Sequence, residues 1–208
     1  MSSVLRLQWT ILPQKPPQPW LSCNRCGGLR QFESSGKVRV NAQGKRLDAW
    51  LVYNCIGCRN SWNRPIFERR NVRDVEPPLM NALLRNDPDY VRRLAFDVED
   101  LRRRSERIAE FPGVDVRKEA LNRPISPADM LELRLVAPFP VSLRLDRLLA
   151  TELKLSRARV EKLAASDVLR ISTGGVRALR RHVKNQTIVQ IAISGLDDEI
   201  DIKTTVGL

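Results

Sequence analysis

The chain has 208 residues, of which 42% are apolar, 5% are aromatic and 29% are charged. This composition is typical of a folded protein with a modest core, and it excludes a disordered or membrane-embedded chain. No apolar run approaches the roughly 18 residues that a membrane helix needs. The first residues carry Arg6 and Gln8 where an export signal would have an apolar core. We therefore expect a cytoplasmic protein with no membrane partner.

Positive charge is in excess and unevenly distributed. Lysine and arginine number 36 against 24 acidic residues, which gives a formal net charge of +12. Residues 1–70 hold twelve basic and three acidic groups, residues 71–140 are close to neutral, and residues 141–208 are basic again apart from an acidic tail at 197–201. Such an excess is typical of proteins that bind polyanions. A solvated surface kept soluble by repulsion is the alternative.

Four cysteines form two Cys-x-x-Cys pairs, Cys23 with Cys26 and Cys55 with Cys58. Each pair can form a tight turn that points both sulfurs at one tetrahedral ion. Without an export signal, metal binding is favoured over disulfides. Four thiolates fill a tetrahedral zinc ion and leave no position for an activated water, so we expect structural Zn²⁺. Iron, or free or redox-active thiols, are the alternatives.

The residues between the two cysteine pairs have the pattern of a β-hairpin. Apolar and polar residues alternate over 31–41 and again over 46–54, and a turn with Gly44 joins the two runs. The second strand would deliver Cys55 beside the first cysteine turn. Together these features predict a zinc ribbon.

The middle of the chain is expected to be mainly helical. Two prolines open a short apolar-spaced segment at 77–83, and Asp87 can cap a longer amphipathic helix that runs to about Ala109. Residues 114–130 show no clear pattern. Alternating leucines over 131–137 predict a half-buried strand.

The C-terminal third predicts two short helices followed by strands. The first helix lies within 141–149 with Ser142 as its candidate cap, and the second spans 157–166 with Ser156 as its cap. Strands are expected at 168–172 and 188–193. This arrangement would bring five basic side chains near one another: Arg144, Arg147, Arg157, Arg159 and Lys162.

Two stretches of this region resemble the RNA-binding domain named after ribosomal small-subunit protein four, also called the alpha-L motif. They are Arg144-Leu-Asp146-x-Leu-Leu and Leu-Ser156-Arg157-x-x-Val-x-Lys-Leu. The resemblance covers about 50 residues and implies that Arg144, Asp146, Ser156 and Arg157 help to form an RNA-facing surface. The chain departs from the family after the second helix, where the usual Gly-bearing turn and Val-Asn-Gly strand end are absent. Ordinary capping and surface residues of a helical hairpin are the alternative explanation.

A longer part of the chain resembles an uncharacterised bacterial domain-of-unknown-function family, number ten sixty-two. The resemblance rests on the stretch from Arg39 to Leu51, on Tyr53-Asn-Cys55, and on Cys58 through Trp62-Asn63. It spans most of the chain and implies no activity.

These features predict an α+β protein of three segments. The first, 1–72, is the β-rich zinc-ribbon module. The second, 73–140, is a helical middle segment with a connecting strand. The third, 141–208, is a small alpha-L-like α/β module that binds RNA and ends in the acidic tail.

The expected function is non-enzymatic binding of structured RNA, such as rRNA or a tRNA-like hairpin, through a basic surface. The alternative is a protein-interaction or DNA-binding adapter, in which the zinc ribbon docks a partner and the alpha-L-like module only packs. An enzyme is disfavoured, because the chain has no Gly-rich phosphate loop, no paired nucleophile and base, and no open metal site. The single histidine, His182, has no cysteine or carboxylate at ligand spacing and is assigned no chemistry.

Overall fold

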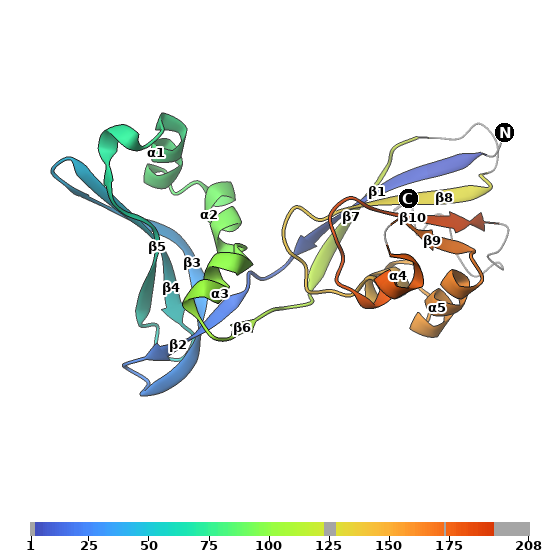
Figure 1. Cartoon of the computed structure of the whole chain (residues 1–208), viewed down its shortest axis with the longest axis horizontal. Coiled ribbons are helices and arrows are strands. Elements are labelled where there is room, and N and C mark those ends of the chain that lie inside the picture. Colours follow the sequence, from blue (N-terminus) through green and yellow to red (C-terminus); the bar gives the residue numbers. More distant parts are fainter. Residues whose placement is uncertain (1–2, 123–127, 173, 194–208) are drawn as a thin grey trace. The chain divides into compact units, whose positions relative to one another are not determined.

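The computed structural model describes residues 3–122, 128–172 and 174–193, which form two compact units (Figure 1). The cysteine unit spans residues 15–110, and the terminal unit combines residues 1–14 with residues 111–208. This division differs from the predicted boundaries after residues 72 and 140. Both units combine a sheet with helices, so the α+β class is confirmed. The acidic tail at 197–201 lies outside the described residues.

The sheet of the cysteine unit is antiparallel, with the strand order β5-β4-β3-β2-β6. Its strands are β2 (Gln18–Cys23), β3 (Gly28–Gln43), β4 (Arg46–Cys55), β5 (Ser61–Asn71) and β6 (Ile108–Ala109). The predicted hairpin is confirmed, because β3 and β4 pair from Phe32 opposite Cys55 to Gln43 opposite Arg46. Gly44 in the turn has a φ of +61°, a left-handed value that glycine adopts without strain.

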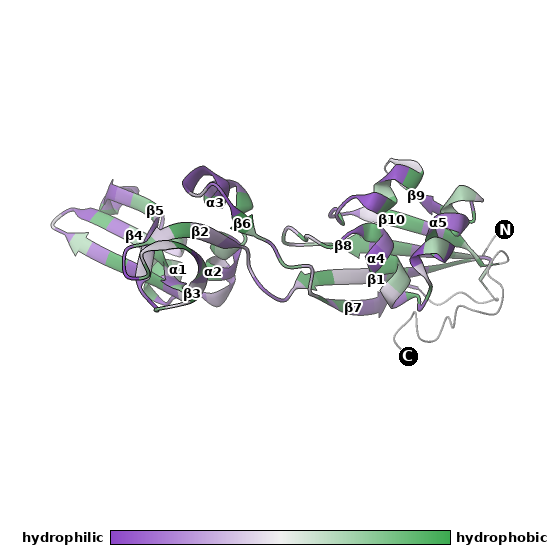
Figure 2. Cartoon of the chain, turned by 90° about the horizontal axis from the view of Figure 1, so that it is seen from below, coloured by the Kyte–Doolittle hydropathy of each residue, from purple (hydrophilic) through white to green (hydrophobic). Residues whose placement is uncertain are grey.

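Burial alternates along β4, where Leu47, Ala49, Leu51 and Tyr53 are buried and the residues between them are partly exposed. The same alternation of hydrophobic and hydrophilic residues is visible along the strands in Figure 2. Three helices pack on the buried face: α1 (Pro77–Leu84), α2 (Pro88–Ala95) and α3 (Val98–Arg104), after a short 3-10 turn η1 (Val72–Asp74). Val91, Ala95 and Leu101 of α2 and α3 share one core with β3 and β4. Residues 73–110 of the predicted middle segment are therefore part of the cysteine unit, whereas residues 111–140 belong to the terminal unit.

The single helix predicted from Asp87 to about Ala109 is wrong, because the chain forms α2 and α3 with a break between them. At the break the Asp97 carboxylate accepts a hydrogen bond from the backbone N–H of Asp100 at 3.0 Å, which starts a new helix. Aspartate side chains compete with the backbone in this way and favour helix caps over helix interiors. Ile108 and Ala109 then form β6, which pairs with β2.

The terminal unit has a five-stranded sheet of order β7-β1-β8-β10-β9. Its strands are β1 (Val4–Pro13), β7 (Val114–Ala120), β8 (Met130–Val136), β9 (Leu169–Ile171) and β10 (Thr187–Ala192). β1 runs parallel to β8, and the other neighbours are antiparallel. The N-terminal strand was not predicted. Because residues 4–13 form this strand, they belong to the terminal unit, whereas the predicted first segment, 1–72, joined them to the cysteine turns.

Two helices, α4 (Leu145–Glu152) and α5 (Arg157–Ala165), cover one face of this sheet (Figure 1). A 3-10 helix, η2 (Gly175–Arg180), packs against both helices. The buried core includes Leu148, Leu149, Val160 and Leu163 together with residues of β1, β8 and β10. The opposite face of the sheet carries polar side chains such as Arg134. A helix pair on one face of an amphipathic sheet is a common way to bury an α+β core.

One predicted cap of these helices is confirmed and the other is wrong. The Ser156 hydroxyl accepts a hydrogen bond from the backbone N–H of Arg159 at 3.1 Å and caps α5. Ser142 does not cap α4, because that helix begins at Leu145 with Arg144 in the cap position. The Ser142 hydroxyl is buried and has no hydrogen-bond partner among the described residues.

Candidate metal centre and basic surface

The first cysteine turn connects β2 to β3. The backbone N–H groups of Cys26 and Gly27 both donate to the carbonyl oxygen of Cys23, at 3.1 and 2.9 Å. Gly27 has a φ of +69°, and a side chain in that left-handed conformation would be strained. Glycine directly after the second cysteine therefore forms this turn without strain.

The second cysteine turn connects β4 to β5 with a related geometry. The N–H of Arg59 donates to the carbonyl of Cys55 at 2.9 Å, and Arg59 has a φ of +63°. The N–H of Ile56 donates to the carbonyl of Gln31 on β3 at 3.0 Å. That bond holds the second turn beside the first, because β3 begins at the first turn.

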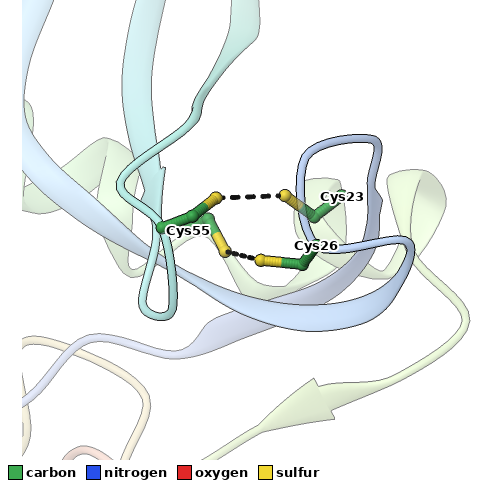
Figure 3. A group of neighbouring side chains, drawn as sticks. Cys23, Cys26 and Cys55 are labelled. Carbon is green, nitrogen blue, oxygen red and sulfur yellow. Dashed lines mark hydrogen bonds between the residues drawn. The ribbon is translucent and has the colours of Figure 1, made fainter.

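All four predicted metal ligands come together. The four sulfur atoms lie within 4.8 Å of one another, with 3.5 Å between those of Cys23 and Cys58 and 3.9 Å between those of Cys26 and Cys55. Figure 3 shows sulfurs from the two turns pointing toward one another. A tetrahedral ion with metal–sulfur distances near 2.3 Å requires sulfur–sulfur edges of about 3.8 Å. The cluster is therefore a possible metal site.

Two thiols of this cluster, those of Cys23 and Cys26, have pKa values shifted in opposite directions. Burial opposes ionisation of Cys23, but hydrogen bonds from the Cys26 backbone and from the Cys58 and Cys55 thiols lower its pKa to about 6. The hydrogen bond with Cys58, followed by burial, raises the pKa of Cys26 to about 12. Ionisation of Cys23 is thus favoured over that of Cys26, and a bound cation would offset the repulsion between thiolates.

In the terminal unit, Arg144 and Arg157 converge on the carboxylate of Asp146. The Asp146 side chain is completely buried, whereas those of Arg144 and Arg157 are 39% and 54% exposed. Arg144 donates to Asp146 from Nη2 at 2.6 Å and from Nε at 3.1 Å. Arg157 donates from Nη2 at 2.8 Å and from Nε at 3.2 Å. Each guanidinium keeps further N–H groups for another anion, because it carries five.

Asp146 therefore positions the arginines and does not itself face a ligand. Asp146 is completely buried on α4, so any part it has in the predicted RNA-facing surface is to hold these arginines. Burial opposes ionisation of Asp146, but hydrogen bonds from Arg157 and Arg144 outweigh this effect and hold its pKa below the usual 3.8.

The other predicted residues lie on the same two helices. Arg147 on α4 and Lys162 on α5 are exposed, and neither side chain forms an ion pair with the rest of the described chain. Arg159 is partly exposed, and Ser156 caps α5. The structure brings Arg144 and Arg157 into one cluster, while Arg147, Arg159 and Lys162 extend the positive charge along the helices.

The structure adds a neighbouring segment that sequence patterns did not indicate. Arg144 forms an isolated antiparallel bridge with His182, and the N–H of Leu145 donates to the carbonyl of Arg181 at 2.9 Å. The residues are almost 40 positions apart in the sequence, so no local pattern could have paired them. The bridge places further cationic residues beside the start of α4.

No helix among the residues described combines the length and apolar character needed to cross a membrane. The two units define a class: an α+β protein with a possible four-cysteine metal site in one unit and a basic helix pair in the other. A family model described as protein of unknown function (DUF1062) matches residues 40–174, and the chain belongs to this family. The match includes the second cysteine turn and both basic helices. No curated protein and no solved structure matches the chain.

Proposed function

We propose that this protein is a non-enzymatic RNA-binding protein in which a zinc ribbon stabilises the cysteine unit and the α4–α5 surface of the terminal unit binds structured RNA. The observation that carries the RNA proposal is the pair Arg144 and Arg157, anchored on one buried carboxylate with their guanidinium groups partly exposed. Arginines held in place before binding lose little side-chain freedom when they meet phosphate.

The metal part of the proposal rests on the sulfur geometry. The distances of 3.5 and 3.9 Å fit the edges of a zinc–thiolate tetrahedron. Cys23 and Cys55 are buried, and all four sulfurs lie within 4.8 Å, so four thiolates would close the coordination shell. A closed shell suits a structural role, and metal binding would add to the folding free energy of the unit. Iron in place of zinc would leave this structural role unchanged.

Electrostatics and shape support RNA as the ligand. The net charge of +12 attracts polyanions over a long range. The helix pair also resembles the alpha-L motif at Arg144, Asp146, Ser156 and Arg157, positions that in that family help to form the RNA-facing surface. A short, rigid cluster of cations can recognise the arrangement of phosphates in a folded RNA, but it is poorly suited to reading the sequence of bases.

The test uses cations that are not part of the Asp146 cluster. Replacing Arg157 would also remove a partner of a buried carboxylate, so weaker binding could reflect misfolding. The variant R147Q/K162Q instead removes two exposed charges that form no ion pair with other described residues. R134Q is the matched control, because Arg134 is exposed on the sheet face opposite α4 and α5.

Binding to a labelled rRNA or tRNA-like hairpin is measured across a series of salt concentrations. We expect R147Q/K162Q to weaken binding and to reduce the slope of log K against log salt by about 2, or about 1 for each phosphate that the protein no longer neutralises. R134Q should match the wild type. If all three proteins have the same affinity and slope, the α4–α5 surface is not the RNA site.

A second candidate function is an adapter that docks a protein or DNA through the cysteine unit. Two apolar residues beside the cysteine turns favour it, because Leu29 is 58% exposed and Ile56 is 46% exposed. The two residues lie near each other, because the N–H of Ile56 donates to the carbonyl of Gln31, which is two residues after Leu29 on β3. The variant L29S/I56S separates the two functions, since it should abolish partner capture by an adapter and leave RNA binding intact.

A further inference from the structure

A small cavity lies beside the start of α4 in the terminal unit. It has a volume of about 80 Å³ and is lined by Leu145, by Gly174 and Ala178 at η2, and by residues that follow η2. The last group consists of Arg181, His182, Lys184 and Thr187. Pockets that enclose whole small-molecule ligands usually measure about 300–1,000 Å³, so this cavity suits a single small group.

The lining is cationic. Arg181, His182 and Lys184 contribute three side chains that carry or can carry positive charge, and none of the lining residues is acidic. Neither Arg181 nor Lys184 forms an ion pair with any residue that the structure describes, and the nearby Arg180 pairs with Glu161 instead. The cavity therefore concentrates positive charge that the described protein does not neutralise.

The backbone that carries these side chains is held on both sides. The N–H of Leu145 donates to the carbonyl of Arg181 at 2.9 Å, and the N–H of Val183 donates to the carbonyl of Leu143 at 3.0 Å. The Thr187 hydroxyl donates to the carbonyl of Lys184 at 2.9 Å. The backbone beside the cavity is therefore fixed, while the side chains of Arg181, His182 and Lys184 that it carries are exposed to an incoming anion.

We propose that this cavity is a binding pocket for one phosphate group, either free phosphate or the terminal phosphate of a nucleic acid strand. Three cationic side chains around one small cavity match a compact anion that has acceptor oxygens in several directions. The cavity is too small for a nucleoside, so the rest of such a ligand would lie outside it. His182 bridges to Arg144, which brings the pocket next to the proposed RNA surface. Binding of a strand-terminal phosphate rests on the proposed RNA-binding function, whereas binding of free phosphate does not.

The first experiment uses His182 as a probe, because it is the only histidine in the chain. Its ring signals are followed by NMR during titration with inorganic phosphate at constant pH and ionic strength. We expect a saturable shift in the wild type that disappears in R181Q/K184Q. The variant R177Q is the matched control, because Arg177 is exposed on η2 and does not line the cavity. No saturable shift, or the same shift in all three proteins, overturns the pocket.

The second experiment compares one RNA hairpin carrying either a 5′-phosphate or a 5′-hydroxyl. If the strand end is the source, the phosphorylated form should bind about tenfold more tightly, and R181Q/K184Q should remove the difference. Saturable binding of inorganic phosphate with equal affinity for both hairpins would support the pocket with free phosphate as its ligand. Phosphate binding without any hairpin binding would keep the pocket and overturn the RNA function. Hairpin binding with no phosphate effect in either experiment would overturn the pocket and keep the RNA function.

Discussion

The buried carboxylate of Asp146 and the exposed guanidinium of Arg157 meet at a distance of 2.8 Å between Oδ2 and Nη2. The contact joins the first turn of α4 to the first turn of α5, since Arg157 directly follows the Ser156 cap. Arg144 shares the same carboxylate oxygen at 2.6 Å. A negative charge inside the core is thereby balanced by two positive charges at the surface. The stability of the helix pair and the placement of its arginines thus depend on one side chain.

Replacing Asp146 with asparagine should test this dependence. Asparagine keeps the shape but removes the charge that both guanidinium groups contact, so we expect a loss of about 2–4 kcal/mol in the free energy of unfolding. E161Q is the control, because Glu161 forms a longer, more exposed pair with Arg180 at 3.7 Å and should cost at most about 0.5 kcal/mol. Urea unfolding measures both. Equal stability of the two variants would contradict the role given to Asp146.

Acid should destabilise the protein through Asp146 and Asp100. Hydrogen bonds from arginine side chains outweigh burial at both residues and hold each pKa below its usual 3.8. The folded state therefore binds fewer protons than the unfolded state. The stabilisation from each carboxylate is complete above the unfolded pKa and is lost as the pH falls through the folded pKa. Unfolding free energies measured from about pH 6 down to about pH 2 should fall, and D146N and D100N should each flatten the decrease. An unchanged slope in both variants would contradict this assignment.

Arg64 should be essential for attaching α2 and α3 to the sheet of the cysteine unit. Its side chain is only 4% exposed and donates to Asp100 at 2.6 Å and to the Leu94 carbonyl at 2.8 Å. We expect R64A to lower the unfolding free energy by about 3–5 kcal/mol, because it removes the buried cation that joins β5 to Asp100 and to the Leu94 carbonyl. R64K should restore little of the lost stability, since an ammonium group lacks the planar fork of the guanidinium. R73A, at an exposed position on η1, should be neutral within about 0.5 kcal/mol. A stable R64A would show that the helices hold without this link.

Local patterns in the sequence predicted several elements correctly. The alternation over 46–54 matches β4, and the two cysteine spacings predicted ligands that do come together. The strand expected at 131–137 and the helix at 157–166 also match β8 and α5 to within one residue at each end. In each case the signal is contained in neighbouring residues: side-chain periodicity, a capping serine or a ligand spacing.

The features that could not be predicted depend on interactions between distant residues. Strand β1 pairs Leu7 with Leu133 and with Ala120, more than 110 residues away, so nothing near residue 7 reveals its partners. The burial of Asp146 could not be predicted either, because the sequence motif does not show that two arginines, one of them 11 residues away, would cover its carboxylate. The break at Asp97 was missed because the apolar spacing continues across it, whereas in the structure that side chain forms a helix cap.

Backbone conformation alone should distinguish two adjacent glycines of the first cysteine turn. A Cβ added at Gly27 or at Gly28 meets nothing within 4 Å, but only Gly27 has a positive φ, at +69°. G27A should therefore cost about 1–2 kcal/mol through left-handed strain. G28A should be neutral or slightly stabilising, because alanine narrows the unfolded ensemble. Urea unfolding of the two variants gives the comparison, and equal stabilities would show that the turn does not require its left-handed residue.

Removing one sulfur should remove the metal while leaving the turn largely intact. Under the proposed zinc assignment, the wild type should contain about one ion per chain, and C55S should contain far less, because a serine hydroxyl cannot replace a thiolate ligand. I56S is the matched control, because Ile56 is exposed in the same turn and is not one of the four cysteine ligands. It should keep the metal content of the wild type. Elemental analysis of the purified proteins gives the content and distinguishes zinc from iron. Trp62 packs against the buried cluster that includes Cys23 and Cys55, so its fluorescence should change when a chelator removes the ion. Equal metal content in C55S and I56S would exclude the four sulfurs as the binding site.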